Sequence, residues 1–508
     1  MSRRTPFVAL ALLLPLGLAQ AKRPRDDKDR EEIAPPRMMK MVAPSYHFSA
    51  DAIGATPGGA KDIASARDHI MAGEVPNPQT FTPEGLFSEH DLPLPSTRPC
   101  KQVLCLSTAA TTADLAAQPE VRVLAQLGFS SNLEAKTWQR EPLNLVAVID
   151  KSGSMSGEPL DTVKASLHQL IDQLGPTDQL SVVLYGDRSH VHLSPTPIRD
   201  RAALHRSIDQ IASAGSTSME EGLRVGYEVA RKSAPGFHGR TRLMLFTDER
   251  PNVGATDKGS FMTMARDASR GGVGLTTIGV GTHFGAELAT AISSVRGGNL
   301  FFFPRVADMK AKFQKDFDTL VTELAFDLNL KVKPSPGYRM VGIYGLPGDL
   351  LKRTPDGGVE MTVETLFLSR ERGGIFFAFA PEAGALPPQG PVASASAAYH
   401  GTDGRPYQDQ VSFALVSGAL PLGLARGRLL VDEITTLKQA TELHLHKNDQ
   451  EGAYRLVHGL RGRLAQHPEL GLERELSTVA KLDETLTRLS GHKGEPHATR
   501  DPVSGLPR

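Results

Sequence analysis

The hydrophobic positions change their period along the chain, and these changes divide it into parts. Between residues 143 and 325, apolar runs such as LNLVAVID and TRLMLFTD alternate with segments whose apolar residues recur at helical spacing. In the segment EPLDTVKASLHQLIDQL, one helical face carries Leu160, Val163, Leu167, Leu170, Ile171 and Leu174. Such alternation predicts an α/β fold with a doubly wound, mainly parallel sheet and helices on both faces.

Short β-type runs occur on both sides of this region. Residues 96–142 contain KQVLCLST, VRVLAQLGFS and EAKTWQRE, and residues 326–417 contain runs such as FDLNLKVKPS and GGIFFAFAP. Residues 418–491 return to helical spacing, and the Gly, Pro and Asn residues that interrupt it favour helical hairpins over one long coiled coil. The pattern therefore predicts a β-rich flank on each side of the α/β region and a helical region after them.

The ends of the chain carry little hydrophobic pattern. Residues 22–55 are charged and contain proline, which is typical of a flexible linker, and residues 492–508 have the composition of a disordered tail. Between the linker and the first flank, residues 56–95 contain a short helical pattern made of Ile63, Ala66, Ile70 and Met71. Gly73 and Pro76 follow it and are expected to end the helix.

The first 21 residues have the three parts of a signal peptide. MSRR is a positive start, Phe7 to Leu18 is an apolar run, and Ala19 to Ala21 form a small-x-small cleavage pattern. A membrane-spanning helix needs about 20 apolar residues, and this run is shorter. We therefore expect residues 1–21 to be cleaved and the mature protein to be exported, periplasmic or secreted, and not transmembrane.

Charge and cysteine content narrow the possible partners. The chain of 508 residues has 57 basic and 57 acidic side chains, so no overall positive field favours nucleic acid. Its two cysteines, Cys100 and Cys105, allow a short disulfide loop in an oxidising compartment, and two unpaired thiols are the alternative. Two cysteines alone do not make a closed zinc site, which usually has four ligands.

Oxygen-bearing residues follow three of the apolar runs. Asp150, Ser152 and Ser154 follow the first strand, Thr217 lies in AGSTSMEEGL before a helix, and Asp248 ends LMLFTD. In open α/β sheets ligands bind at the carboxyl ends of the strands. A set of carboxylates and hydroxyls suits Mg²⁺, Mn²⁺ or Ca²⁺. The alternative is a strand-to-helix turn in which Asp and Ser cap backbone N–H groups.

These motifs resemble the von Willebrand factor A-type domain. VAVIDKSGSM is similar to its first strand and its D-x-S-x-S metal-ion-dependent adhesion site, and GSTSMEEGL and LFTDERPNVG match its later segments in the right order. The resemblance implies that Ser152 and Ser154 ligate the metal, Mg²⁺ by preference. It also implies that Asp150 and Asp248 act directly or through water, and that Thr217 joins directly in one of two states. An open position would take an acidic side chain of a partner protein.

The resemblance has one departure and one wider implication. Glu249 stands where many members have glycine, which would place an extra carboxylate near the rim of the site. Residues 66–95 resemble the N-terminal segment of bacterial exported members, which, like the more distant inter-α-trypsin inhibitor heavy chains, carry β-rich sequence on both sides of the A domain. We therefore expect the flanks 96–142 and 326–417 to pair into one sandwich with the A domain inserted, since short strands bury little alone.

Other motifs lack the arrangement that a cofactor site, a metal site or a catalytic site requires. TTIGVGTHFG, with Gly279, Gly281 and Gly285, is not a dinucleotide fingerprint. His444 and His446 would point to different faces of a helix. His190 and His192 share a strand face without a third ligand, so we expect them to face solvent. SGSMSG is not a nucleophile elbow, because Asp150 intervenes between the strand and the serines.

Three functions remain. The first is a metal-dependent protein-binding module of adhesion type at the cell envelope. The second is a scaffold or assembly subunit with a structural metal, in which the C-terminal helices bind partners. The third, a hydrolase or phosphoryl-transfer enzyme, would need a general base beside the ion, and Glu249 and Asp187 are the candidates. We expect the protein not to be an enzyme.

Overall fold

The computed structural model of the protein describes most of the chain between residues 54 and 491. The described ranges are 54–57, 63–95, 99–133, 137–248, 258–280, 295–303, 306–346, 351–369, 372–382 and 390–491. The expected signal peptide, nearly all of the linker, the tail and Glu249 lie outside them. No helix in these ranges is long and apolar enough to cross a membrane.

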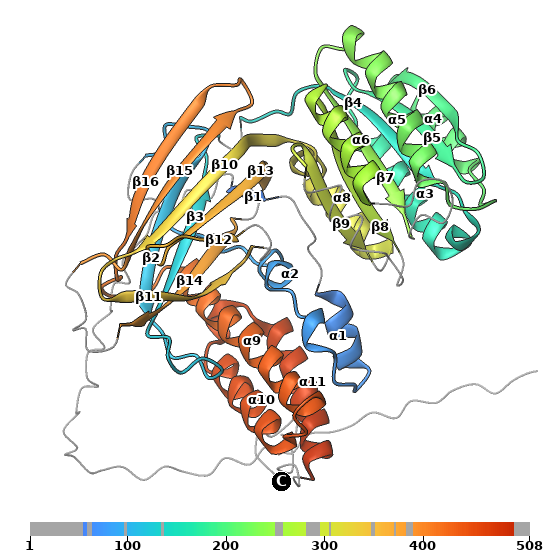
Figure 1. Ribbon diagram of the computed structural model, residues 1–508. Helices are drawn as coiled ribbons and strands as arrows, with labels where there is room; N and C mark the ends of the chain where they lie inside the picture. Colours follow the sequence, from blue (N-terminus) through green and yellow to red (C-terminus); the bar gives the residue numbers. More distant parts are fainter. Residues whose placement is uncertain are drawn as a thin grey trace, which may run out of the picture. The chain divides into compact units, whose positions relative to one another are not determined.

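The α/β region contains a six-stranded sheet in the order β6-β5-β4-β7-β8-β9 (Figure 1). Its strands are β4 (Leu143–Asp150), β5 (Gln179–Tyr185), β6 (His190–Pro197), β7 (Arg240–Thr247), β8 (Val273–Val280) and β9 (Gly298–Phe303). Neighbouring strands are parallel except for the edge pair β5 and β6. The predicted doubly wound, mainly parallel sheet is confirmed, and β6 is one of its edge strands.

Helices cover both faces of this sheet. One face packs against α3 (Glu158–Gln173), α4 (Arg201–Asp209) and α8 (Val306–Leu320). The other packs against α5 (Met219–Ser233) and α6 (Lys258–Arg270). In β4, Leu145 and Ile149 face the first group, while Val146 and Val148 face the second. Burial on both faces explains why β4 is continuously apolar in sequence.

The two flanks contribute to two antiparallel sheets. One contains β1 (Gly54–Pro57), β13 (Val359–Ser369), β10 (Glu323–Pro334), β15 (Ala393–Gly401) and β16 (Pro406–Phe413), with β12 (Leu351–Arg353) paired to β13. The other contains β11 (Tyr338–Tyr344), β14 (Gly374–Pro381), β3 (Val123–Ser130) and β2 (Cys105–Thr112). β14 pairs with β3, so strands from before and after the α/β region share one sheet. A common core joins the two sheets, and the α/β region is inserted between β3 and β10.

The strand expected in EAKTWQRE is wrong in its described part, because residues 137–142 form no strand. Arg140 in this stretch makes ion pairs with Asp178, at 2.7 Å, and with Asp318, at 2.8 Å. Asp178 precedes β5 and also accepts a hydrogen bond from the backbone N–H of Leu143. The segment therefore connects β3 to β4 without forming a strand, and the ion pairs of Arg140 hold it in place.

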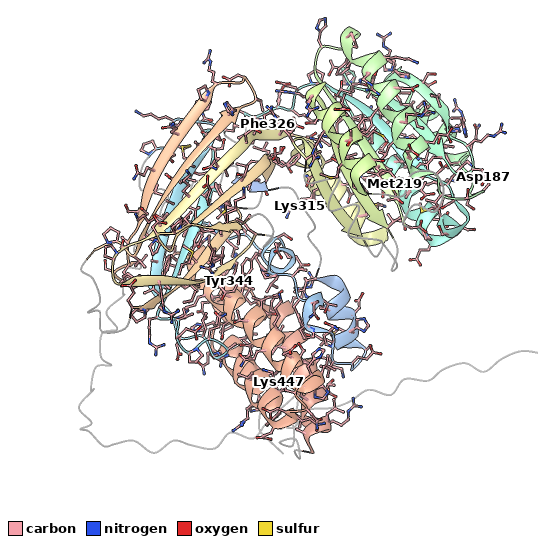
Figure 2. The ribbon with its side chains drawn as sticks, viewed as in Figure 1. Asp187, Met219, Lys315, Phe326, Tyr344 and Lys447 are labelled. Atoms are coloured by element: carbon pink, nitrogen blue, oxygen red, sulfur yellow. A yellow bond between two sulfur atoms is a disulfide. The ribbon has the colours of Figure 1, made fainter. Side chains whose placement is uncertain are left out.

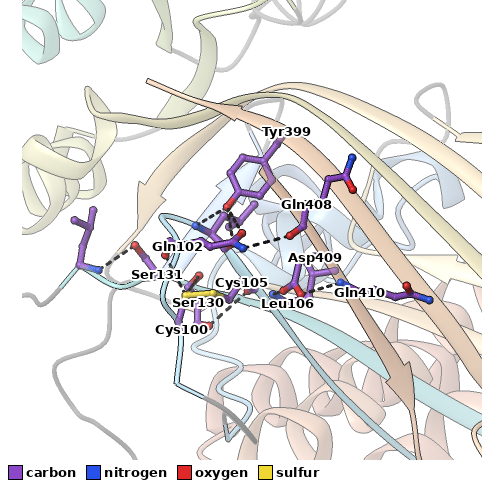
Figure 3. Close-up of a disulfide and its surroundings, with 12 residues drawn as sticks. Cys100, Gln102, Cys105, Leu106, Ser130, Ser131, Tyr399, Gln408, Asp409 and Gln410 are labelled. Atoms are coloured by element: carbon purple, nitrogen blue, oxygen red, sulfur yellow. Dashed lines mark hydrogen bonds between the residues drawn. A yellow bond between two sulfur atoms is a disulfide. The ribbon is translucent and has the colours of Figure 1, made fainter. Parts of the chain in front are cut away.

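A disulfide joins Cys100 and Cys105 at the start of β2, so the alternative of unpaired thiols is wrong (Figure 3). Beside it, the Tyr399 hydroxyl lies 2.7 Å from the Leu104 carbonyl oxygen, to which it donates. The Leu106 N–H donates to a carboxylate oxygen of Asp409 at 2.8 Å. Tyr399 and Asp409 belong to β15 and β16 of the other sheet, so these bonds tie the two sheets together next to the disulfide.

The C-terminal region is helical, as expected. It contains α9 (Leu422–Leu445), α10 (Gln450–Ala465) and α11 (Glu473–Ser490), which share a core with α1 (Ala64–Met71) and α2 (Pro83–Phe87). Within this core the buried Arg67 of α1 pairs with the buried Glu475 of α11 at 2.9 Å. The N-terminal helical segment and the C-terminal helices therefore form one packed unit.

Glu433 of α9 is another buried acid in this unit, and one of its carboxyl oxygens has no hydrogen-bond partner among the described residues. Burial raises the pKa of Glu433 well above its ordinary value, and the charge of Glu475 adds to the rise. The folded state therefore favours a neutral Glu433. The raised pKa of Glu433 adds to the free energy of unfolding. This stabilisation is fully present below the pKa that Glu433 has in the unfolded chain, and it is lost as the pH rises toward its pKa in the folded state.

We expect Glu433→Gln to stabilise the protein increasingly as the pH rises from about 5 to about 8. The amide stays neutral, whereas the wild-type carboxyl must stay protonated at a cost of up to about 1.4 kcal/mol per pH unit. Urea unfolding at several pH values measures the difference. Glu442→Gln, on the exposed side of the same helix, is the control and should show no such trend. A pH-independent difference for Glu433→Gln would contradict the assignment.

Candidate metal centre

The expected donor residues lie at the carboxyl ends of the central strands. β4 has β5 on one side and β7 on the other, and the helices that follow these strands pack on opposite faces. This is the switch point at which open α/β sheets form a crevice. Asp187, which follows β5, and Met219, the first residue of α5, mark this end of the domain in Figure 2.

Asp150 is the last residue of β4 and is fully buried. One carboxylate oxygen accepts a hydrogen bond from the Ser152 N–H at 2.9 Å, and the other accepts one from the Thr247 hydroxyl at 3.2 Å. Burial raises the pKa of Asp150, although hydrogen bonds from Ser152 and Thr247 partly oppose the rise. None of the described groups that shift this pKa is positively charged, so a bound cation would supply the compensating charge.

The hydroxyls form a row from the interior to the surface. The Ser152 and Ser154 oxygens are 3.0 Å apart, and the Ser154 hydroxyl donates to a carboxylate oxygen of Asp248 at 3.2 Å. Ser152 and Asp248 are buried, whereas Ser154, in the short 3₁₀ turn Gly153–Met155, is exposed. Four of the five expected donors are thus linked through hydrogen bonds, and one of them, Ser154, is open to solvent.

Thr217 lies in a loop that backbone hydrogen bonds fasten to the other donors. The Gly153 N–H donates to the Gly215 carbonyl at 2.9 Å, and the Ala214 N–H donates to the Lys151 carbonyl at 2.6 Å. Thr217 itself is buried, two residues after Gly215. The loop that carries Thr217 therefore lies directly against the loop that carries Ser152 and Ser154.

Asp187 and Gly215 support this loop, and the sequence pattern alone had not assigned them that role. One Asp187 carboxylate oxygen accepts hydrogen bonds from the Ser216 N–H, at 2.8 Å, and the Ser216 hydroxyl, at 2.7 Å. Gly215 has a φ of +91°, and an added Cβ would lie 2.7 Å from the other Asp187 oxygen. The hydrogen bonds from Ser216 lower the pKa of Asp187, which suits a permanently charged support and not a general base.

The donor chemistry fits a hard divalent cation. All five residues offer oxygen, as carboxylate or hydroxyl, and oxygen is what Mg²⁺, Mn²⁺ and Ca²⁺ prefer. Across the described ranges, no group of three or more His, Cys, Asp or Glu side chains is arranged to hold a metal. The hydroxyls are therefore essential to the set, since its two carboxylates alone are too few.

The histidine pair of β6 differs from expectation in one respect. His190 is exposed as expected, but His192 is half-buried and its Nε2 lies 2.8 Å from the carbonyl oxygen of Ser207 in α4. His192 therefore contacts a helix and does not simply face solvent.

Comparison with known proteins identifies the domain that contains these residues. The profile of the von Willebrand factor type A domain matches residues 144–316. Uncharacterized protein sll0103 of Synechocystis is 31% identical over 183 residues, which are 36% of this chain and 42% of that protein. Inter-alpha-trypsin inhibitor heavy chain H1 of Sus scrofa is 34% identical over 147 residues, 27% of this chain and 16% of that protein.

The match to these curated relatives thus spans less than half of the length of each. Among solved structures, the von Willebrand factor type A protein of Catenulispora acidiphila covers 76% of this chain and 90% of its own, at 13% identity and a TM-score of 0.44. The profile match, the sheet order and the oxygen donors at the switch point coincide in one region. Residues 144–316 of this chain form a von Willebrand factor type A domain.

Proposed function

We propose that this protein is a metal-dependent protein-binding module of adhesion type, which captures an acidic side chain of a partner protein at the cell envelope. The observation that carries the proposal is the connected set of Asp150, Ser152, Ser154 and Asp248, in which Ser154 is exposed and the other three residues are buried. Von Willebrand factor type A domains mediate protein–protein interactions, and the site lies in that domain.

The five donors would hold the cation, with Thr217 as the fifth, and Mg²⁺ is the ion we propose for this oxygen set. When bound, the cation supplies positive charge and an open coordination position for a carboxylate. The protein's own residues orient the site: Thr247 and the Ser152 N–H fix the Asp150 carboxylate, and Asp187 holds the neighbouring loop through Ser216. A site fixed in this way loses little entropy when a partner binds.

Two observations weigh against the other functions. Asp187 already accepts two hydrogen bonds from Ser216, so it is poorly suited to take a proton from a water or a substrate. The C-terminal helices use much of their apolar surface to pack on α1, α2 and one another.

Export is supported by the disulfide, because disulfides persist in oxidising compartments.

Capture of envelope proteins by the immobilised chain tests the proposal. We expect a defined set of proteins to bind in Mg²⁺, to be released by EDTA, and to bind again when Mg²⁺ is restored. Ser154→Ala should weaken this capture, because it removes a donor at the exposed end of the site. Ser156→Ala is the matched control, since Ser156 is also exposed, follows in the same loop and lies outside the donor row.

Equal capture in EDTA and in Mg²⁺ would overturn the proposal and favour the scaffold function. For a captured protein, replacing its acidic surface residues one at a time by the corresponding amides should identify one side chain whose loss abolishes binding. If no single acidic residue matters, the carboxylate mechanism is wrong even where the metal is required.

A further inference from the structure

A second side-chain cluster lies on the helical surface of the same domain, between α3 and α4. His168 of α3 and His205 of α4 face each other with their Nδ1 atoms 2.7 Å apart. Both side chains are about 30% exposed, so solvent reaches them. None of the five oxygen donors belongs to this cluster.

Each histidine is held by a carboxylate from the opposite helix. His168 Nε2 lies 3.0 Å from an Asp209 oxygen, and His205 Nε2 lies 3.1 Å from an Asp172 oxygen. The two helices carry the same short pattern, since HQLID spans 168–172 and HRSID spans 205–209. The bonds therefore cross between the helices as a reciprocal pair.

Antiparallel packing of the helices explains the reciprocity. Arg201, at the start of α4, donates to carbonyl oxygens at the end of α3, while Lys164 of α3 donates to those of Asp209 and Ile211. Lys164 is thus engaged with the backbone and not with the Asp209 carboxylate. In antiparallel helices, matching i and i+4 positions exchange places, so each His meets the Asp of the other helix.

The hydrogen bonds determine which ring nitrogens are available. An ionised carboxylate only accepts, so each Nε2 must carry the hydrogen and donate it to its Asp. The two Nδ1 lone pairs then face each other across 2.7 Å. A metal ion is a species that two facing imidazole lone pairs bind together.

We propose that His168 and His205 form a second metal site, for a divalent transition-metal ion such as Zn²⁺ that prefers imidazole nitrogen. Asp172 and Asp209 are its positioning residues, because a carboxylate on the outer nitrogen fixes the ring and increases its basicity. Tetrahedral zinc with bonds of about 2.0–2.1 Å places two nitrogens about 3.3–3.4 Å apart, so the two rings would have to separate by about 0.6 Å when zinc binds. Water or a donor from another molecule would fill the remaining positions.

This site is independent of the proposed function, since its donors are nitrogen and the adhesion-type centre is all oxygen. Its effect would be to fasten α4 to α3, the helix that follows the loop of Ser152 and Ser154. The competing explanation is that the four residues form a hydrogen-bonded tie that binds no metal.

Zinc titration of the full chain by calorimetry, with excess Mg²⁺ present to fill the oxygen centre, separates the two explanations. His168→Ala and His205→Ala should each abolish one zinc-binding event. Asp172→Asn and Asp209→Asn should weaken the same event by about 10- to 100-fold. His69→Ala is the matched control, because His69 is also exposed and bonded to one carboxylate, that of Glu74, but no second histidine is bonded to it.

Three further measurements check the zinc site and the folding of the variants. Zinc should raise the thermal unfolding midpoint of the wild type and of His69→Ala but not of His168→Ala, and metal-free circular dichroism should show that all variants are folded. Cu²⁺ as a probe should show electron paramagnetic resonance couplings from two imidazole nitrogens in the wild type. Unchanged zinc binding in both alanine variants, or no zinc event in the wild type, would overturn the proposal.

Discussion

Asp150→Asn should lower the Mg²⁺ affinity of the chain by at least about 100-fold. The carboxylate is fully buried, and no protein cation is among the groups that shift its pKa. The amide keeps the size of the side chain but removes the charge that a cation would neutralise. Loss of residues that merely orient metal ligands costs about 10- to 100-fold, so loss of a charged ligand should reach at least the upper end. Calorimetric titration of the full chain with Mg²⁺ measures the change.

Asp187→Asn is the matched control for this measurement. Asp187 lies in the same group of loops, but it is exposed and its partner is Ser216. An asparagine oxygen still accepts those hydrogen bonds, so Mg²⁺ affinity should fall much less than in Asp150→Asn. If both variants lost affinity equally, the effect would come from the net charge of the surface, and the assignment of Asp150 would be wrong.

Glu323→Ala should lower the free energy of unfolding by about 3–5 kcal/mol. Glu323 is the first residue of β10, and its carboxylate lies 2.6 Å from the guanidinium of Arg242 in β7. Arg242 is 2% exposed, and burial lowers its pKa while Glu323 opposes that change. Without Glu323 the cation stays buried without its counter-charge, held by Thr276 and the Gly297 carbonyl. Urea unfolding gives the difference.

The same strand supplies the control. Arg240, two residues before Arg242, pairs with Glu141 at 2.7 Å, but both side chains are more than 40% exposed. Glu141→Ala should therefore cost at most about 1 kcal/mol. Similar losses for the two alanine variants would show that burial does not govern the strength of these pairs.

The parts of the fold that could be predicted from sequence are those that depend on local pattern. β4 reads as a strand because it is buried on both faces, and the switch point follows from the order in which strands and helices alternate. The oxygen donors stand out because polar residues directly follow buried strands. The strand expected at 137–141 is wrong, because Arg140 belongs to an ion-pair cluster that only the folded chain brings together.

Contacts that depend on how helices and loops lie against each other could not be predicted. His168 and His205 are 37 residues apart, and neither has a second potential ligand close by in the sequence except Asp172 and Asp209. Their meeting depends on the antiparallel packing of α3 and α4. The bonding of Asp187 to Ser216 likewise depends on a glycine conformation at Gly215 that no periodicity reveals.

The Arg140 contacts have a consequence for how the inserted domain joins the sandwich. One side chain binds Asp178 and Asp318, and thus connects the point where the chain enters the von Willebrand factor type A domain with α8, from which it leaves. For the sandwich, the whole domain is therefore a long connection between β3 and β10 whose entry and exit are held together by Arg140. The pairing of β3 with β14 therefore closes the sandwich across the inserted domain, while Glu323 of β10 contacts Arg242 of β7 within that domain.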